Sequence, residues 1–183
     1  EPGLCQALEF DDGKLMLANN EDIDQLDYSL LLQRAGKDIL FSLFDSSDMM
    51  VLLNWSELKG SLSIWNGLEK DIFPYLSPKK RFVFIDLSDC SCRSAEEIRE
   101  ACSLMRSFSN RFDFTISMNR NEAERVAEAE NISYGSIEAL ASQLYTRLHC
   151  SRLVIHLLDC SCYVSEGQVR HRKNFHTPHP VIS

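Results

Sequence analysis

The pair Asn119 and Glu122 has the residue types and the spacing that could hold a phosphate together with Mg²⁺. It follows the largely apolar run 112–116, at a point where a strand is expected to become a helix. Ligands of open α/β sheets bind at such strand ends, because helix N-termini offer free N–H groups there. Mg²⁺ keeps its waters and takes few carboxylates, so Glu122 would hold it through water. The same pair is also a helix cap, and on spacing alone the cap is the favoured interpretation.

Two further strand ends carry polar side chains. Asp86 follows the apolar run 82–85, and Arg93 lies seven residues later. A carboxylate and a guanidinium at this position could hold a phosphate, which arginine grips through its planar fork of donors. An ion pair or a capped loop is an equally weighted alternative. Asn54 ends the apolar run 49–53 and is the third polar strand end.

Other residues that invite a chemical role are better explained structurally. The pairs Cys90/Cys92 and Cys160/Cys162 have one residue between their cysteines, whereas structural zinc sites prefer two to four. His156 lies inside an apolar run, where a structural histidine is more common than a ligand. We therefore expect no metal at the cysteines and no ligand at His156.

The elements that must position these residues alternate along the chain. Four apolar runs, at 49–53, 82–85, 112–116 and 153–158, read as buried strands covered on both faces of a parallel sheet. Apolar residues at helical spacing predict helices at 62–76, after the capping box that opens at Ser94, near Asn121, and after Ser136. An acidic cluster at 21–24 indicates the start of another helix. This order predicts an α/β, doubly wound, mostly parallel sheet with right-handed crossovers.

The two ends have a different pattern. Residues 5–17 alternate around Asp11-Asp12-Gly13 and predict a β-hairpin, and a second small hairpin is expected around Glu166-Gly167. We therefore divide the chain into a hairpin segment at 1–20 and an α/β core at 21–183.

Composition narrows the functional classes. The chain has 183 residues and a net charge of −8, which argues against a nucleic-acid or acidic-membrane partner. No stretch approaches the roughly 20 apolar residues of a membrane-spanning helix. Seven cysteines, an odd number, suit reduced thiols in a cytoplasm better than a disulfide framework.

Several segments in matching order resemble the ribokinase-like (PfkB) carbohydrate kinase family. Asn119-x-x-Glu122 is similar to its N-x-x-E signature, and Asp86-Leu87-Ser88-Asp89 with Arg93-Ser94 resembles its strand-ending DLADPxxRS segment. Residues 7–14 and 51–55 resemble segments of one PfkB subgroup. The resemblance covers nearly all of the chain.

The resemblance implies ATP-dependent phosphorylation of a sugar hydroxyl. It places Asn119 and Glu122 at the Mg²⁺–phosphate site, Asp86 and Arg93 on the nucleotide-phosphate side, and Asn54 near the sugar cleft. It also implies that the hairpin belongs to a lid that excludes water, and that two copies pair through their lids as a homodimer.

One family motif has no counterpart in the sequence. The G-A-G-D motif supplies the catalytic Asp and an anion hole, and this chain contains no Gly-x-Gly. We expect a central fragment whose catalytic segment would follow Ser183 and whose sugar-binding Gly-rich region would precede Glu1. A non-catalytic sugar or nucleotide sensor on the same fold, or a nucleoside kinase, remains the alternative.

Overall fold

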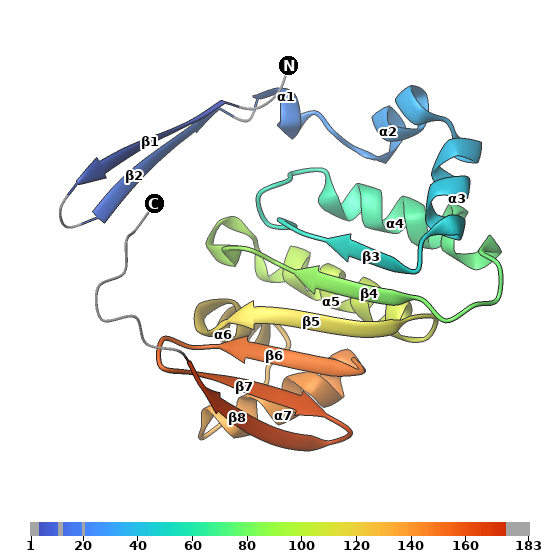
Figure 1. The fold of residues 1–183 in the computed structure, drawn as a ribbon. Coiled ribbons are helices and arrows are strands. Elements are labelled where there is room, and N and C mark those ends of the chain that lie inside the picture. Colours follow the sequence, from blue (N-terminus) through green and yellow to red (C-terminus); the bar gives the residue numbers. More distant parts are fainter. Residues whose placement is uncertain (1–3, 11–12, 20, 175–183) are drawn as a thin grey trace.

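The computed structural model describes residues 4–10, 13–19 and 21–174 and contains one large sheet and one hairpin (Figure 1). The large sheet has six strands in the order β3-β4-β5-β6-β7-β8. Strands β3 to β6 are parallel, and β7 and β8 are added antiparallel. The strands are β3 Met49–Leu52, β4 Phe82–Asp86, β5 Asp113–Asn119, β6 Arg152–His156, β7 Cys160–Ser165 and β8 Gln168–Lys173. The predicted mostly parallel α/β sheet is confirmed.

Helices lie between the strands and ahead of the sheet. They are α1 Glu21–Asp24, α2 Tyr28–Ala35, α3 Lys37–Ser46, α4 Ser61–Asp71, α5 Ala95–Ser109, α6 Arg120–Ala129 and α7 Ile137–Leu148, with short 3₁₀ turns η1 Phe73–Tyr75 and η2 Cys90–Cys92. No described helix is long and apolar enough to cross a membrane.

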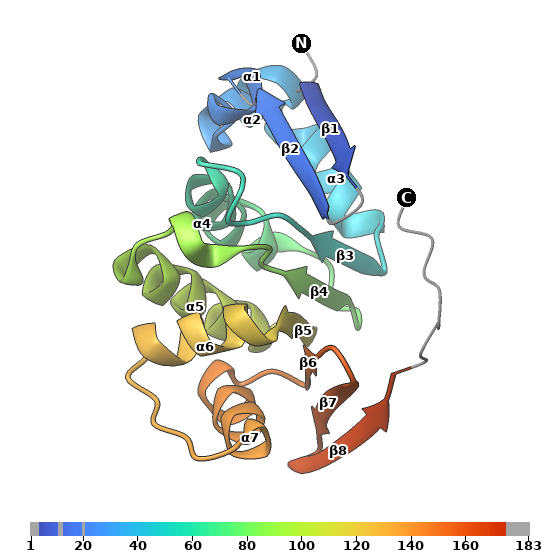
Figure 2. The same cartoon turned by 90° about the vertical axis from the view of Figure 1, so that its left-hand side faces the viewer.

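Helices α4 to α7 all cover one face of the sheet (Figure 2). The strand order runs in one direction, and right-handed crossovers taken in one direction place every helix on the same side. On the opposite face Met49, Val51 and Phe82 are exposed, while their neighbours Met50 and Val83 are buried beneath the helices. The strands were expected to be covered on both faces, but the described residues include no second helical layer there.

Local sequence signals explain where the helices begin and end. In α5, Ser94 and Glu97 form the predicted capping box, with the Ser94 side chain accepting from the Glu97 N–H. The helix expected at 62–76 stops at Asp71, and η1 follows it. Pro74 lies at the start of η1 and cannot donate the N–H that a longer helix needs. The predicted length was therefore wrong at its C-terminal end.

The N-terminal hairpin consists of β1 Leu4–Phe10 and β2 Gly13–Asn19, paired antiparallel. It projects beyond the sheet on the side toward which β3 to β6 point (Figure 1). The expected turn residues 11 and 12, and the tail from residue 175, lie outside the described residues. The second predicted hairpin is β7–β8, with Glu166 and Gly167 at its turn in left-handed backbone.

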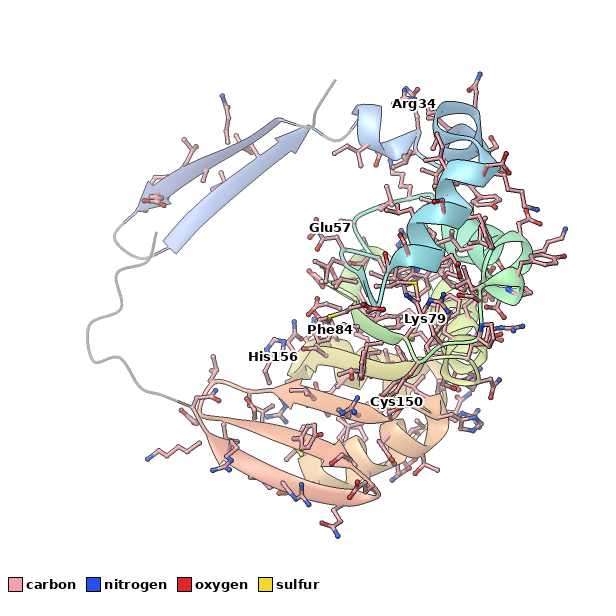
Figure 3. The ribbon with its side chains drawn as sticks, turned by 45° about the vertical axis from the view of Figure 1, so that its right-hand side comes forward. Arg34, Glu57, Lys79, Phe84, Cys150 and His156 are labelled. Carbon is pink, nitrogen blue, oxygen red and sulfur yellow. The ribbon has the colours of Figure 1, made fainter. Side chains whose placement is uncertain are left out.

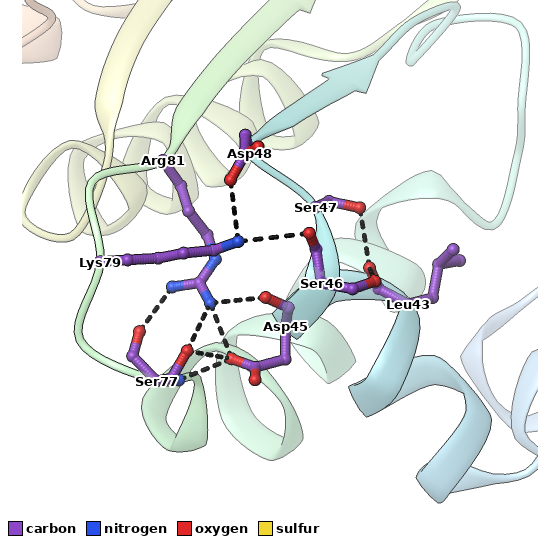
Figure 4. A network of polar contacts seen from close by, with 8 residues as sticks. All are labelled: Leu43, Asp45, Ser46, Ser47, Asp48, Ser77, Lys79 and Arg81. Carbon is purple, nitrogen blue, oxygen red and sulfur yellow. Dashed lines mark hydrogen bonds and ion pairs between the residues drawn. The ribbon is translucent and has the colours of Figure 1, made fainter.

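A polar network fixes the opposite end of the sheet, where β4 begins (Figure 4). Arg81 is buried and donates to the backbone and carboxylate oxygens of Asp45 at 2.9 and 2.7 Å. It also donates to the Ser77 carbonyl at 2.6 Å, and Lys79 bonds Asp48 at 2.8 Å. The network ties α3 to the loop before β4.

This network predicts acid sensitivity. Hydrogen bonds from Ser77, aided by Arg81 and Lys79, hold the pKa of Asp45 below its usual value. A carboxyl with a lowered folded-state pKa contributes stability above its unfolded pKa of about 3.9, and that contribution is lost as pH falls through the folded value. Asp45→Asn should therefore lower the urea midpoint at pH 7, and the difference from the parent should shrink as the pH is lowered below about 4.

The control is Asp38→Asn on the same helix, α3, since Asp38 is exposed and lies outside the network. Urea midpoints at several pH values check the prediction. The prediction is contradicted if the difference in urea midpoint between Asp45→Asn and the parent is the same at pH 3 as at pH 7.

Candidate functional site

The junction of β5 and α6 brings Asn119 and Glu122 together at the carboxyl end of the sheet. The Asn119 side chain accepts from the Glu122 N–H at 2.9 Å. In return, the Glu122 carboxylate accepts from the Asn119 N–H at 2.9 Å and from its amide at 2.5 Å. The helix cap expected from the spacing is therefore present. It also fixes the Glu122 carboxylate at the strand end.

Glu122 is unusual because it is a carboxylate with 3% of its surface exposed and no cationic partner among the described residues. Burial raises its pKa above the usual value, and the negative charges of Asp86 and Asp89 raise it further, against the lowering effect of the Asn119 N–H. A buried carboxylate with two further negative charges nearby makes a region that favours a cation. This arrangement is a candidate site for a positive ion.

A pocket of about 540 Å³ opens beside this junction. Its walls are the start of α6, from Asn119 to Asn121, and the end of β6 with the following turn, from His156 to Cys160. His156 is exposed and pairs in register with Asn119 (Figure 3). The sequence interpretation treated His156 as structural. Its place as the last residue of a parallel strand was the signal that it would reach the ligand edge.

Asp86 is the last residue of β4, and Asn54 follows the end of β3 by two residues. Asp86 is half-buried and accepts from the Ser88 N–H at 3.2 Å. Ser88 in turn donates its hydroxyl to the Asn54 side chain at 3.0 Å. Asn54 and Ser88 both have left-handed backbone, with φ of 56° and 60°, which costs less for asparagine than for serine. Ser88 is a candidate site residue that the sequence interpretation did not single out.

Arg93 is not brought to Asp86. Its guanidinium is 7% exposed and donates to the carbonyls of Trp55, Ser56 and Leu58 at 3.1, 3.1 and 2.6 Å. It also lies over the Trp55 ring at 4.9 Å and pairs with Glu97 at 2.7 Å. The guanidinium therefore donates its hydrogen bonds mainly to carbonyls in the loop that follows Asn54. The structure therefore places Arg93 behind the strand ends as a brace.

The described residues offer no ready-made metal cage. No group of three or more His, Cys, Asp or Glu side chains among them could hold a metal ion directly. Both oxygens of Glu122 already accept hydrogen bonds, and their remaining lone pairs suit the waters of Mg²⁺. Burial raises the pKa of Cys90 to about 12, helped by Glu122 and Asp89, so its thiol stays protonated at neutral pH.

Two comparisons with solved structures show the fold. A ribokinase from Thermotoga maritima is 14% identical with a TM-score of 0.64, over 96% of this chain and 49% of that one. A PfkB protein from Polaromonas sp. JS666 is 13% identical with a TM-score of 0.68, over 95% of this chain and 54% of that one. Both similarities support a ribokinase-type fold, as the resemblance implied.

Sequence comparisons show the family. The profile described as prokaryotic ketohexokinase matches residues 1–183. A ketohexokinase from Haloferax volcanii is 25% identical over 166 residues, which are 91% of this chain and 44% of the relative. The chain thus spans a little under half the length of that relative. On this match, the chain belongs to the prokaryotic ketohexokinase family, a group of ribokinase-like carbohydrate kinases.

Proposed function

We propose that this chain supplies the magnesium- and phosphate-binding side of an ATP-dependent kinase for a ketohexose. The observation that carries the proposal is the buried Glu122 carboxylate, held by Asn119 at the carboxyl end of β5 without a cationic partner among the described residues, beside a pocket of about 540 Å³. Family membership supports the reaction class, and the name of the Haloferax relative supports a ketohexose as acceptor.

The chemistry asked of these residues is positioning and charge stabilisation. The acceptor hydroxyl oxygen attacks the γ-phosphorus of ATP, the bond from that phosphorus to the bridging oxygen breaks, and ADP leaves while a base takes the hydroxyl proton. Free N–H groups in the first turn of α6 would face the phosphates. Glu122, with Asp86 and Asp89 nearby, would hold the waters of Mg²⁺, and the ion would neutralise charge on the transferred phosphoryl group. We assign no general base among the described residues.

The remaining candidates take supporting roles. Asn54, together with Ser88, would face the sugar hydroxyls, since both have left-handed backbone just after neighbouring strands. Arg93 would serve the nucleotide side indirectly, by fixing the loop after Asn54. Asp86 would act through its charge on Glu122.

The β1–β2 hairpin would serve as a lid over the substrate side and as the surface through which two copies pair. Its register puts Leu8, Phe10, Leu15 and Leu17 on one face, and all four are exposed. A two-stranded hairpin is marginal by itself, so an apolar face of this kind favours a partner. We further propose a cytoplasmic location, in keeping with the reduced thiols.

The test is ADP release from ATP and Mg²⁺ by the intact gene product against ketohexoses, aldohexoses, pentoses and nucleosides. We expect turnover that depends on a ketohexose. If only a nucleoside supports turnover, the acceptor is a nucleoside and the proposed ketohexose is wrong. If ATP or a sugar binds and no acceptor stimulates ADP release, the protein is a sensor and the kinase proposal fails.

A further inference from the structure

One wall of the pocket is a tight turn that needs support from elsewhere. Leu157–Cys160 joins β6 to β7, and the Leu157 N–H donates to the Cys160 carbonyl at 2.8 Å. Leu158, at the tip of the turn, is 98% exposed. The backbone carbonyls of Leu157, Leu158 and Asp159 have no partner within the turn itself.

Asn174, directly after β8, supplies partners to all three carbonyls. Its side-chain amide donates to Leu157 O at 2.7 Å and to Leu158 O at 3.1 Å. Its backbone N–H donates to Asp159 O at 2.9 Å. The amide orientation is unambiguous, because carbonyl oxygens on one side require the NH₂ group there. On the other side, the Ser161 hydroxyl donates to the Asn174 side-chain oxygen at 3.0 Å.

These contacts make Asn174 a clamp between the edge strand and the pocket wall. The opposite wall is the start of α6, lined by Asn119, Arg120 and Asn121, and Glu122 is hydrogen-bonded to Asn119 there; the proposed function gives this wall the phosphates. The turn that Asn174 holds contributes Leu157, Leu158 and Cys160, which are apolar or weakly polar, and one carboxylate, Asp159. A nucleoside triphosphate matches these two walls: its charged phosphates suit the α6 wall, and its flat, weakly polar base suits the Leu157–Cys160 turn.

We infer that Asn174 is a positioning residue for the nucleotide: it holds the Leu157–Cys160 turn where that turn contacts the nucleoside end of ATP. The inference rests on the proposed function for the identity of the ligand, but the clamp itself stands on the hydrogen bonds of Asn174. Asn174 would touch neither the sugar nor the phosphates, so it should affect ATP affinity and leave the rate of phosphoryl transfer alone.

The experiment uses the intact gene product with Asn174→Ala and Asn174→Asp. Losing two amide hydrogen bonds in the turn should weaken ATP binding about tenfold, by calorimetry, and raise the KM for ATP by a similar factor. The kcat and the KM for the sugar should stay within about twofold of the parent. Asn174→Asp should be the weaker binder of the two, because its carboxylate faces two carbonyl oxygens. Hydrogen exchange of the amides at 157–160 should quicken in both variants.

The matched control is Asn110→Asp, at the C-cap of α5, where the side chain is exposed and lies outside the pocket lining. It should alter neither ATP binding nor exchange of the turn. Faster exchange of the turn with unchanged ATP affinity would overturn the positioning role and leave the proposed kinase intact. Unchanged exchange would overturn the clamp. Failure of the parent protein to bind ATP would overturn both the positioning role of Asn174 and the proposed kinase function, and the parent protein alone shows that result.

Discussion

Glu122→Gln should lower the kcat of the intact gene product at least 100-fold, which corresponds to about 2.7 kcal/mol of lost transition-state stabilisation. Glutamine at the third helical position can still cap α6, but it carries no charge for Mg²⁺ and its waters. The loss should therefore fall on the chemical step. Steady-state kinetics with ATP, Mg²⁺ and the best acceptor, together with a melting curve, measure both effects.

Two controls separate charge from capping. Glu128→Gln lies on the same helix, where its exposed carboxylate pairs with Arg125, and should leave activity unchanged. Glu97→Gln makes the same change in the capping box of α5 and also removes the pair with Arg93, so its melting temperature gives an upper limit on what a weakened cap costs. If Glu122→Gln keeps full activity while losing as much stability as Glu97→Gln, Glu122 is a helix cap and nothing more.

Arg93→Met should lower the free energy of unfolding by about 3 kcal/mol, because it removes the donors of three carbonyls and leaves them buried. Methionine approximates the apolar stem, so the loss reports the guanidinium and its position over Trp55. Arg93→Lys should restore only part of it, since one ammonium cannot reach the carbonyls of Trp55, Ser56 and Leu58 together. Chemical denaturation of each variant measures the effect.

Arg99→Met, in the helix α5 that follows Arg93, provides the comparison. Arg99 is partly exposed, lies 3.9 Å from Glu96 and donates one hydrogen bond, to the Ala129 carbonyl at 3.3 Å, so its removal should cost less than about 1 kcal/mol. Equal losses for the two arginine variants would mean that water replaces the Arg93 hydrogen bonds, and the brace would then have no special role.

The sheet could be predicted from sequence, but the segment before it could not. Apolar runs and helical spacing locate β3 to β6 because both depend on residues close together in the chain. Helices α2 and α3 were not predicted. Their position depends on contacts such as the Tyr28 ring over Gly67, where a side chain on Gly67 would lie 2.1 Å from that ring. No local pattern in the sequence reveals such an approach.

Some residues of the candidate site could likewise be placed from the sequence, and others could not. Asn119 and Glu122 could be placed because one strand end and one capping rule fix both residues. The direction of Arg93 could not be predicted, since its acceptors are backbone carbonyls in a loop more than thirty residues earlier. The turn at 157–160 was missed for a related reason. The strand was expected to continue to 158, but it ends at His156.

The order of strands in the large sheet is the same as their order in the chain, from β3 to β8. During synthesis on the ribosome, each strand that emerges therefore finds its partner already in place as the free edge left by the preceding one. No formed pair has to separate to admit a later strand, and each pairing closes a loop no longer than one crossover. Contact order stays low for a parallel sheet, so this part of the protein is suited to folding progressively from its N-terminal strand while translation continues.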